Sequence, residues 1–252
     1  MCTSCGCGTP RSSAAAEAAG TVALYENLLG ENDRLAAHVR AHLDEHGVFA
    51  VNLMSSPGSG KTSLLEATIE ALPPGLRVAV IEGDLETEND ADRIRRHGVA
   101  AVQITTGVTC HLDATMVHDA LHGLALDEID ILFVENVGNL VCPADFDVGQ
   151  HRDVVLLSVT EGDDKPDKYP VIFRGADLVL LTKTDLLPHI EEFDVGRARR
   201  SIARVRGSGP ILEVSSKKGV GLDAWIDWLV GEARARRALA SGAPAHADAP
   251  HP

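Results

Sequence analysis

The segment SSPGSGKTSLL at 55–65 constrains the fold of this chain more than any other part of its sequence. It follows an apolar run and opens a helical pattern, which is the strand–loop–helix setting of a phosphate-binding loop. Its glycines let backbone amides approach phosphate oxygens, its lysine adds a positive charge, and its threonine hydroxyl can bind Mg²⁺. Ser55 replaces the first glycine of the usual GxxxxGK[ST] pattern, but this setting disfavours the alternative of an incidental glycine-rich turn. We predict that nucleotide phosphates bind at Gly58, Ser59, Gly60, Lys61, Thr62 and Ser63.

Seven short apolar runs, rich in branched residues, alternate with helical patterns along the chain. Strands that alternate with helices form mostly parallel sheets with helices on both faces. We therefore predict an α/β fold, a P-loop NTPase G domain built on a mostly parallel sheet. The runs lie at 48–54, 77–81, 100–105, 131–134, 154–159, 178–181 and 211–214.

The chain of 252 residues is long enough for one α/β domain but not comfortably for two. We place the P-loop domain, with an internal metal site, at 47–237, and an amphipathic helical extension at 21–46. Small and polar residues at 9–20 predict a flexible linker that follows a cysteine-rich motif at 1–8. Residues 238–252 carry too little apolar surface to offset the entropy of ordering them, so we predict a disordered tail.

The charge and the apolar pattern exclude several classes of partner. A net charge of −14, spread along the chain, disfavours binding to nucleic acid or to anionic lipid. No apolar stretch is long enough to span a membrane, and Glu17 interrupts the alanine-rich N-terminal run that a signal peptide would need. We therefore expect a cytoplasmic protein, whose five cysteines are thiols available for metal or redox chemistry.

Two acidic residues at the ends of predicted strands fit a magnesium site beside the phosphates. Asp84 lies in EGDLETEND, and Glu135 begins ENVG at 135–138, which has the acid-x-x-Gly form of a nucleotide-sensing switch. A solvated turn residue is the alternative for each acid taken alone, and the pair together is better evidence for the magnesium site. We expect Lys61, Thr62, Asp84 and Glu135 to support phosphoryl transfer from the nucleotide to water, although no residue clearly orients that water.

The segment TKTD at 182–185 predicts recognition of guanine. The Asp185 carboxylate can accept hydrogen bonds from the ring N–H and the exocyclic amine of guanine, which adenine cannot supply together. The aliphatic part of Lys183 would stack on the base, and Thr182 replaces the customary asparagine that braces the loop. Ser215, Ser216 and Lys217 follow a later strand and can place a backbone amide near the guanine carbonyl oxygen.

The N-terminus carries Cys2, Cys5 and Cys7, with glycines that let the chain fold back on itself. Three thiolates and the terminal amine form a soft donor set that suits square-planar Ni²⁺, although tetrahedral Zn²⁺ would accept the same thiols. A redox dithiol and an inert tail are the alternatives.

A second candidate metal site lies inside the domain, at Cys110, His111 and Cys142. Cys142 is four residues beyond Gly138 of the predicted switch, so movement caused by the γ-phosphate would shift a metal ligand. Solvent or the same residues of a second subunit can complete the site. Small buried cysteines beside a helix-capping histidine are the alternative.

Further histidines occur at helical spacing, and we expect them to lie on solvated helix faces. His38, His42 and His46 fall on one predicted helix face, and His118 and His122 form another i, i+4 pair. This spacing places any two side chains together, so the sequence favours solvated helix faces over ligands. The tryptophans of the last predicted helix, at 225 and 228, are expected to pack in the core or at an interface.

Taken together, MCTSCGCG, SSPGSGKTSLL, EGDLETENDADR, TGVTCHLDA, ENVGNLVCP, TKTD and SSKKGVGLDA resemble the hydrogenase nickel-incorporation GTPases of the HypB family. The resemblance covers residues 1–8 and about 47–230 and implies a P-loop GTPase that forms a homodimer on binding GTP. It also implies a tight nickel site at the N-terminal cysteines, a weaker nickel or zinc site at the internal triad, and nickel delivery to [NiFe] hydrogenase.

Handover partners implied by the resemblance include a HypA-type accessory protein and the hydrogenase large-subunit maturation complex. The chain lacks the histidine-rich stretch that some relatives carry after the N-terminus. A urease-type nickel-insertion GTPase and a metal-buffering protein with a regulatory nucleotide site are the alternatives. The N-terminal cysteines disfavour the urease type.

Overall fold

The fold is that of a computed structural model, which describes residues 12–84 and 89–240, with side chains from Glu26 to Leu239 within those ranges. The N-terminal motif at 1–8 and residues 241–252 of the predicted tail lie outside the described residues. Helix α8 continues to Ala240, three residues beyond the domain end that we predicted at 237.

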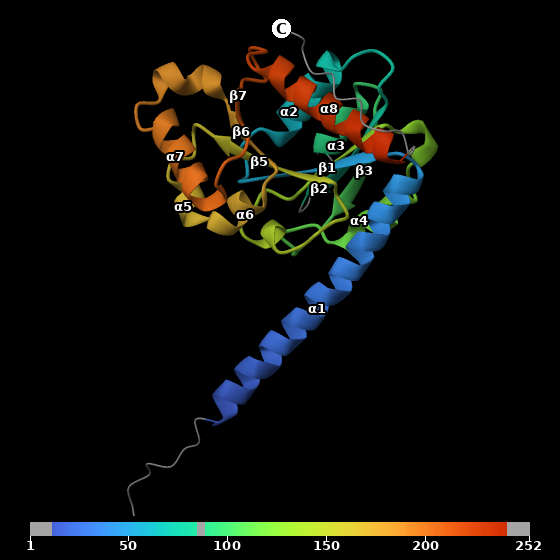
Figure 1. Cartoon of the computed structure of the whole chain (residues 1–252), viewed down its shortest axis with the longest axis vertical. Coiled ribbons are helices and arrows are strands. Elements are labelled where there is room, and N and C mark those ends of the chain that lie inside the picture. The colour runs from blue at the N-terminus through green and yellow to red at the C-terminus, as the bar shows by residue number, and fades with distance from the viewer. Residues whose placement is uncertain (1–11, 85–88, 241–252) are drawn as a thin grey trace, which may run out of the picture.

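A single sheet of seven strands forms the centre of the domain (Figure 1). Its order is β3-β2-β4-β1-β5-β6-β7, and every strand pair is parallel. All seven predicted strands are confirmed, because a parallel sheet buried on both faces selects continuous apolar runs. The strands are β1 Phe49–Ser55, β2 Val78–Asp84, β3 Ala100–Thr105, β4 Ile131–Glu135, β5 Arg152–Ser158, β6 Leu178–Thr182 and β7 Ile211–Val214.

Helices cover both faces of the sheet, as the alternating pattern predicts. One face packs against α2, α3 and α8, where the fully buried Trp225 donates a 2.8 Å hydrogen bond to the Thr68 hydroxyl. The opposite face packs against α1 and α4 at one end and against α6 and α7 at the other. The helices are α1 Ser12–Glu45, α2 Lys61–Ala71, α3 Asn89–Arg95, α4 Ala114–Leu121, α5 Lys165–Lys168, α6 Pro170–Gly175, α7 Val195–Arg206 and α8 Leu222–Ala240, with short 3-10 turns at Leu126–Glu128, Cys142–Ala144 and Thr184–His189.

Helix α1 corrects our prediction of a linker at 9–20, because the helix already begins at Ser12. The run SSAAAEAA is rich in alanine, the strongest helix former, and we gave its lack of an apolar pattern too much weight. The N-terminal part of α1 extends away from the sheet (Figure 1). Its C-terminal part is anchored by the buried Val39 and Leu43, and Gly149 (φ +86°) approaches Val39 so closely that a Cβ would overlap it.

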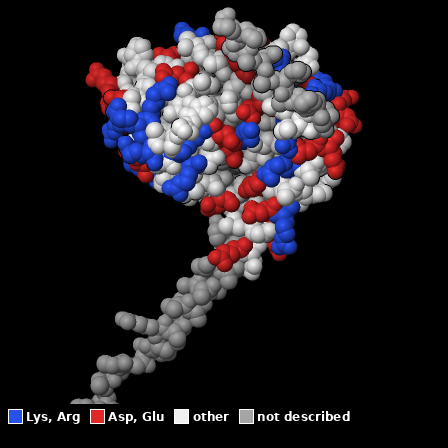
Figure 2. All heavy atoms as spheres, in the orientation of Figure 1, with Lys and Arg blue, Asp and Glu red and all other residues white. Residues whose placement is uncertain are grey.

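Charged side chains of both signs share the surface seen in Figure 2, with basic residues gathered over α7. Several arginines of α7 are paired, including Arg204 with Asp167 at 2.6 Å and Arg199 with Glu213 at 2.8 Å. Within residues 12–84 and 89–240, no helix is both long and apolar enough to cross a membrane.

The sheet order places the predicted nucleotide site. Strand β1 lies at the centre of the sheet. Strands β2, β3 and β4 lie on one side of it, and the chain then crosses to the other side for β5, β6 and β7. The carboxyl ends of strands next to such a reversal border a crevice in which open α/β sheets bind ligands. The loop after β1, the end of β4 and the loop after β5 therefore meet at one edge of the sheet.

Candidate functional site

The phosphate-binding loop joins β1 to α2, and two glycines with positive φ shape it. Gly58 has φ +74° and Gly60 has φ +98°, a conformation that glycine adopts without steric cost. Gly60 immediately precedes α2, so the loop leads into the positive end of the helix dipole. Ser55, the departure from the usual pattern, is fully buried, and its hydroxyl oxygen lies 3.4 Å from Lys61 Nζ. The serine that replaces the usual glycine thus contributes a contact to the lysine of the loop.

Two neighbouring segments hold this loop in place. The Ser59 hydroxyl lies 2.5 Å from a carboxylate oxygen of Glu161, which also accepts the backbone N–H of Ser158 at the end of β5. Thr182, at the end of β6, donates from its hydroxyl to the Ser59 carbonyl at 2.8 Å. Threonine therefore supplies the bracing hydrogen bond that asparagine customarily makes. Sequence patterns did not single out Glu161, which belongs to no motif that we recognised.

The structure brings Thr62, Glu135 and Lys61 together, as the sequence predicts. The Thr62 hydroxyl donates to Glu135 Oε1 at 3.0 Å, and Lys61 Nζ lies 3.8 Å from the same oxygen. Glu135 is 3% exposed, and its Oε2 has no hydrogen-bond partner among the described residues. A buried carboxylate oxygen beside a hydroxyl is a donor set that suits Mg²⁺.

Glu82 is a member of this group that sequence analysis missed. It faces Glu135 across β2 and β4 and is 2% exposed, and its Oε2 also lacks a described partner. Burial, followed by the charge of Glu135, raises the pKa of Glu82 to about 11. Burial also raises the pKa of Glu135, whereas the Lys61 ammonium acts in the opposite direction. Burial therefore disfavours the charged form of both carboxyl groups.

The sequence does mark Glu82, because it is a charged residue inside an apolar strand. Our magnesium prediction rested instead on Asp84, two residues further along the chain. Asp84 ends β2, and its backbone carbonyl accepts a 2.9 Å hydrogen bond from the N–H of Thr106. Its assignment to magnesium and catalysis stays a prediction.

The predicted guanine site is a pocket of about 310 Å³ beside the phosphate-binding loop. Asp185 accepts a 2.6 Å hydrogen bond from the Ser215 hydroxyl, and this bond lowers the pKa of Asp185. Lys183 adopts φ +59° and donates to the Gly58 carbonyl at 2.5 Å, which lays its side chain across the loop. The pocket is lined by Ser59, Gly60, Ser63, Thr182, Lys183, Asp185, Leu186, Ser216 and Lys217. The two predicted recognition segments therefore meet at one pocket with an ionised carboxylate.

The internal cysteines and histidine form one cluster, as predicted. The ligand atoms of Cys110, His111 and Cys142 all lie within 4.8 Å of one another. Both cysteines are free, with their sulfurs 2.7 Å apart, and both are partly exposed. Two thiols and an imidazole are donors that nickel and zinc accept. Cys2, Cys5 and Cys7 lie outside the described residues.

Phe146 orients the histidine of the cluster, a role that sequence analysis did not foresee. Its ring stacks on His111 with centres 4.0 Å apart and planes 24° from parallel. His111 Nδ1 is buried without a described hydrogen-bond partner, and burial lowers the pKa of His111. A neutral imidazole with a free lone pair is the form that binds a metal ion.

Asn136 connects the nucleotide site to the metal cluster. It follows Glu135 directly and is fully buried, and its side-chain oxygen accepts the N–H of Leu112 at 3.0 Å. Leu112 in turn follows His111. At the other end of the switch, a Cβ on Gly138 would lie 2.8 Å from the Pro57 Cα of the phosphate-binding loop. The switch is therefore packed against the phosphate loop on one side and hydrogen-bonded to the metal-binding segment on the other.

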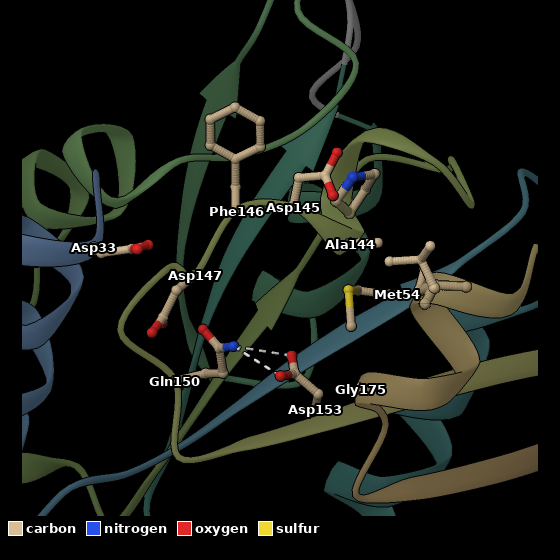
Figure 3. Close-up of a pocket in the computed structure, with 12 residues that line it drawn as sticks. Asp33, Met54, Ala144, Asp145, Phe146, Asp147, Gln150, Asp153 and Gly175 are labelled. Carbon is tan, nitrogen blue, oxygen red and sulfur yellow. Dashed lines mark hydrogen bonds between the residues drawn. The ribbon is translucent and has the colours of Figure 1, made fainter. Parts of the chain in front are cut away.

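An acid-lined pocket of about 270 Å³ lies beyond Cys142 (Figure 3). Gln150 donates to both carboxylate oxygens of Asp153, at 3.0 and 2.9 Å, and burial raises the pKa of Asp153 to about 6. The acids that line the pocket are Asp33, Asp145, Asp147 and Asp153. Arg40 pairs with Asp147 at 2.6 Å, so part of the negative charge of this pocket is already neutralised within the domain.

Comparison with known proteins identifies the family. Residues 49–213 match the model of the CobW/HypB/UreG nucleotide-binding domain. The hydrogenase maturation factors HypB of Rhizobium leguminosarum bv. viciae and Escherichia coli (strain K12) are similar to the chain at 51% and 50% identity. These matches cover 87% and 81% of this chain and 73% and 70% of the relatives.

A crystal structure of HypB from Helicobacter pylori in complex with nickel superposes with a TM-score of 0.78 at 41% identity. It covers 82% of this chain and 97% of that chain. The chain therefore belongs to the HypB family of hydrogenase maturation factors, within the CobW/HypB/UreG group of nucleotide-binding proteins.

Proposed function

We propose that this protein is a GTP-hydrolysing nickel metallochaperone that delivers nickel for maturation of [NiFe] hydrogenase and releases the metal according to its nucleotide state. The observation that carries this proposal is the short path from the phosphate site to the metal cluster. Thr62 contacts Glu135, Asn136 follows it and binds the N–H of Leu112, and Leu112 adjoins His111. A γ-phosphate and Mg²⁺ that move Glu135 would therefore change the position of a metal ligand.

In the proposed hydrolysis, Lys61 stabilises negative charge on the phosphates, and Thr62 and Glu135 hold Mg²⁺. Bound Mg²⁺ would neutralise charge that develops on the transferred phosphoryl group. Asp185 and Lys183 select and hold guanine, while Glu161 keeps Ser59 and the loop in position. Water attacks the γ-phosphorus, the bond to the β-phosphate oxygen breaks, and the products are GDP and phosphate.

We further propose that GTP binding joins two copies of the chain through the surface around the metal cluster. Val108 is fully exposed and Val141 is 56% exposed, and these two residues flank the ligands Cys110 and Cys142. Exposed apolar side chains beside an incomplete ligand set fit a two-fold interface, at which each subunit would supply the same donors. The handover partners would be a HypA-type accessory protein and the hydrogenase large subunit in the cytoplasm, where thiols stay reduced.

Phosphate release by the purified chain tests the enzymatic part of this proposal. We expect Mg²⁺-dependent GTP hydrolysis that Lys61→Ala abolishes, because the alanine cannot stabilise charge on the phosphates. Hydrolysis no faster than in buffer, with no effect of Lys61→Ala, would leave a metal-buffering protein with a regulatory nucleotide site as the better description.

Nickel affinity measured with GDP and with a non-hydrolysable GTP analogue tests the coupling. We expect the two affinities of the internal site to differ by about tenfold, a coupling of about 1.4 kcal/mol. Cys142→Ala should remove this difference because it deletes a ligand. Equal affinities in the unmodified chain would refute the coupling. Activation of apo-hydrogenase compared with apo-urease by the loaded chain would decide between the two recipients.

A further inference from the structure

The two cysteines of the internal cluster can react with each other as well as with a metal ion. The sulfurs of Cys110 and Cys142 lie 2.7 Å apart. A disulfide bond is about 2.05 Å long, so a small movement of either side chain brings the sulfurs within bonding distance. Both thiols are free and partly exposed, which lets a small oxidant reach them from solvent. The three other cysteines of the chain lie in its N-terminal motif at 1–8.

The docking of two loops sets this distance, because the two cysteines are 32 positions apart in the chain. Cys110 lies in the loop after β3, and Cys142 lies in the segment after β4. Asn139 joins the two segments. Its amide donates to the Cys110 carbonyl at 3.3 Å, and its side-chain oxygen accepts the N–H of Val141 at 2.8 Å. The hydrogen bonds of one side chain therefore hold both cysteine segments in place.

Close and accessible thiol pairs are typical of cysteines that respond to oxidants. The first thiol to be oxidised is captured by a neighbouring, resolving cysteine, and the disulfide prevents further oxidation. In compartments where thiols are kept reduced, disulfides of this kind are transient and serve in redox sensing. Cys110 and Cys142 meet both structural requirements, which are accessibility and a neighbour within reach. Metal binding and disulfide formation use the same two sulfurs, so each excludes the other.

We propose that Cys110 and Cys142 form an intramolecular disulfide when hydrogen peroxide oxidises the metal-free chain, and that this disulfide closes the internal metal site. One thiol attacks the peroxide, the O–O bond breaks, and the products are a sulfenic acid and water. The second thiol attacks the sulfenic sulfur, the S–S bond forms, the S–O bond breaks, and a second water leaves. Two molecules of a small thiol reverse the change by exchange and leave as their own disulfide.

The disulfide would change both the metal cluster and its connection to the switch. Of the three-ligand group that the described residues form, only His111 would keep a free donor atom. The bond would also tie the segment that follows the switch covalently to the loop that carries His111. Oxidation would therefore prevent nickel binding at this site whatever nucleotide is bound. The proposal rests on the geometry of the two thiols and does not require GTP hydrolysis or nickel delivery.

Peroxide treatment of a full-length chain that keeps only these two thiols tests the proposal. Cys→Ser substitutions at Cys2, Cys5 and Cys7 give that chain. We expect the folded, metal-free protein to lose both free thiols and the mass of two hydrogen atoms, to stay monomeric on a non-reducing gel, and to recover with dithiothreitol. Bound Ni²⁺ should slow the reaction by about tenfold or more, and the oxidised chain should bind Ni²⁺ about 10²-fold more weakly.

Two controls separate pairing of the thiols from general oxidation. With the added change Cys142→Ser, the chain should form no intramolecular disulfide and should gain oxygen at Cys110 instead. In urea, disulfide formation should be slower than in the folded chain, because the two loops are no longer docked. Equal rates in urea and in buffer would overturn the proposal, since the fold would then play no part in the reaction.

Peptide mapping of the unmodified chain after the same treatment needs no substitution and gives a second measurement. We expect a cross-linked pair of peptides that contain Cys110 and Cys142. Sulfinic acid on either cysteine without this pair, disulfide-linked dimers in its place, or equal nickel affinity of the internal site before and after oxidation would each overturn the proposal. These results do not depend on whether the chain hydrolyses GTP, so they stand apart from the outcome of the phosphate-release assay.

Discussion

Replacement of Asn136 by alanine is the sharpest test of how the nucleotide site and the metal cluster communicate. The Asn136 side-chain oxygen accepts the N–H groups of Leu112 and Val137, each at 3.0 Å, and its amide lies 3.3 Å from the Asn52 side-chain oxygen. Leu112 and Val137 are buried, at 0% and 5% exposure, so solvent does not readily replace the lost acceptor. Alanine therefore leaves two buried donors without partners.

The expected loss of stability follows from those two donors. A buried donor left without a partner costs about 1–3 kcal/mol, so Asn136→Ala should lower the free energy of unfolding by about 2–6 kcal/mol. A domain of this kind is stable by about 5–15 kcal/mol, so the variant should be weakened but still folded. Urea denaturation of the metal-free protein measures the change.

The same variant should also weaken the coupling. We expect the ratio of nickel affinities with GDP and with a GTP analogue to move towards one, because the segment that carries His111 loses one of its hydrogen bonds to the switch and keeps that from the Asn139 amide to the Cys110 carbonyl, at 3.3 Å. Leu229→Ala is the matched control, since it removes a fully buried side chain of α8 at a similar cost of about 2–5 kcal/mol. That control should keep the ratio of the unmodified chain. Two results would refute the reasoning. One is a ratio of nickel affinities in Asn136→Ala equal to that of the unmodified chain, and the other is a loss in the free energy of unfolding below about 1 kcal/mol.

Three further predictions rest on single contacts. Asp185→Asn should lower GTP affinity by about 10²-fold or more and improve binding of xanthosine triphosphate, whose carbonyl replaces the guanine amine; unchanged selectivity in a competition assay would contradict the assignment. Gly138→Ala should weaken nucleotide binding measured by titration calorimetry, because its Cβ would lie 2.8 Å from the Pro57 backbone, and affinity equal to that of the unmodified chain would show that the switch is not packed there when nucleotide binds. Burial holds the pKa of His151 at about 4, so its contribution to stability, up to about 3 kcal/mol, is present above pH 6.5 and is lost as the pH falls towards 4. His151→Gln should flatten that part of the stability–pH curve, and an unchanged slope would exclude His151 as its source.

The sequence determined the elements of the fold and the chemical groups of the two described sites. Seven apolar runs became seven strands, because parallel strands buried on both faces leave a pattern that does not depend on distant neighbours. The phosphate loop was equally clear, since glycines at positive φ, a lysine and a hydroxyl are required within a few residues. The alanine-rich run was misjudged as a linker because apolar periodicity was weighed above intrinsic helix propensity.

Tertiary structure decided which of those groups touch one another. The register of β2 against β4 sets Glu82, not Asp84, opposite Glu135, and a shift of β2 by one residue would have turned the Glu82 side chain to the other face of the sheet. The packing of α4 on α1 brings His118 to His38, and the fold of the switch carries Asn136 to the N–H of Leu112. These contacts join residues that are 24 to 80 positions apart in the chain. The sequence therefore names the donors and acceptors, while the packing of sheet and helices selects the pairs that act together.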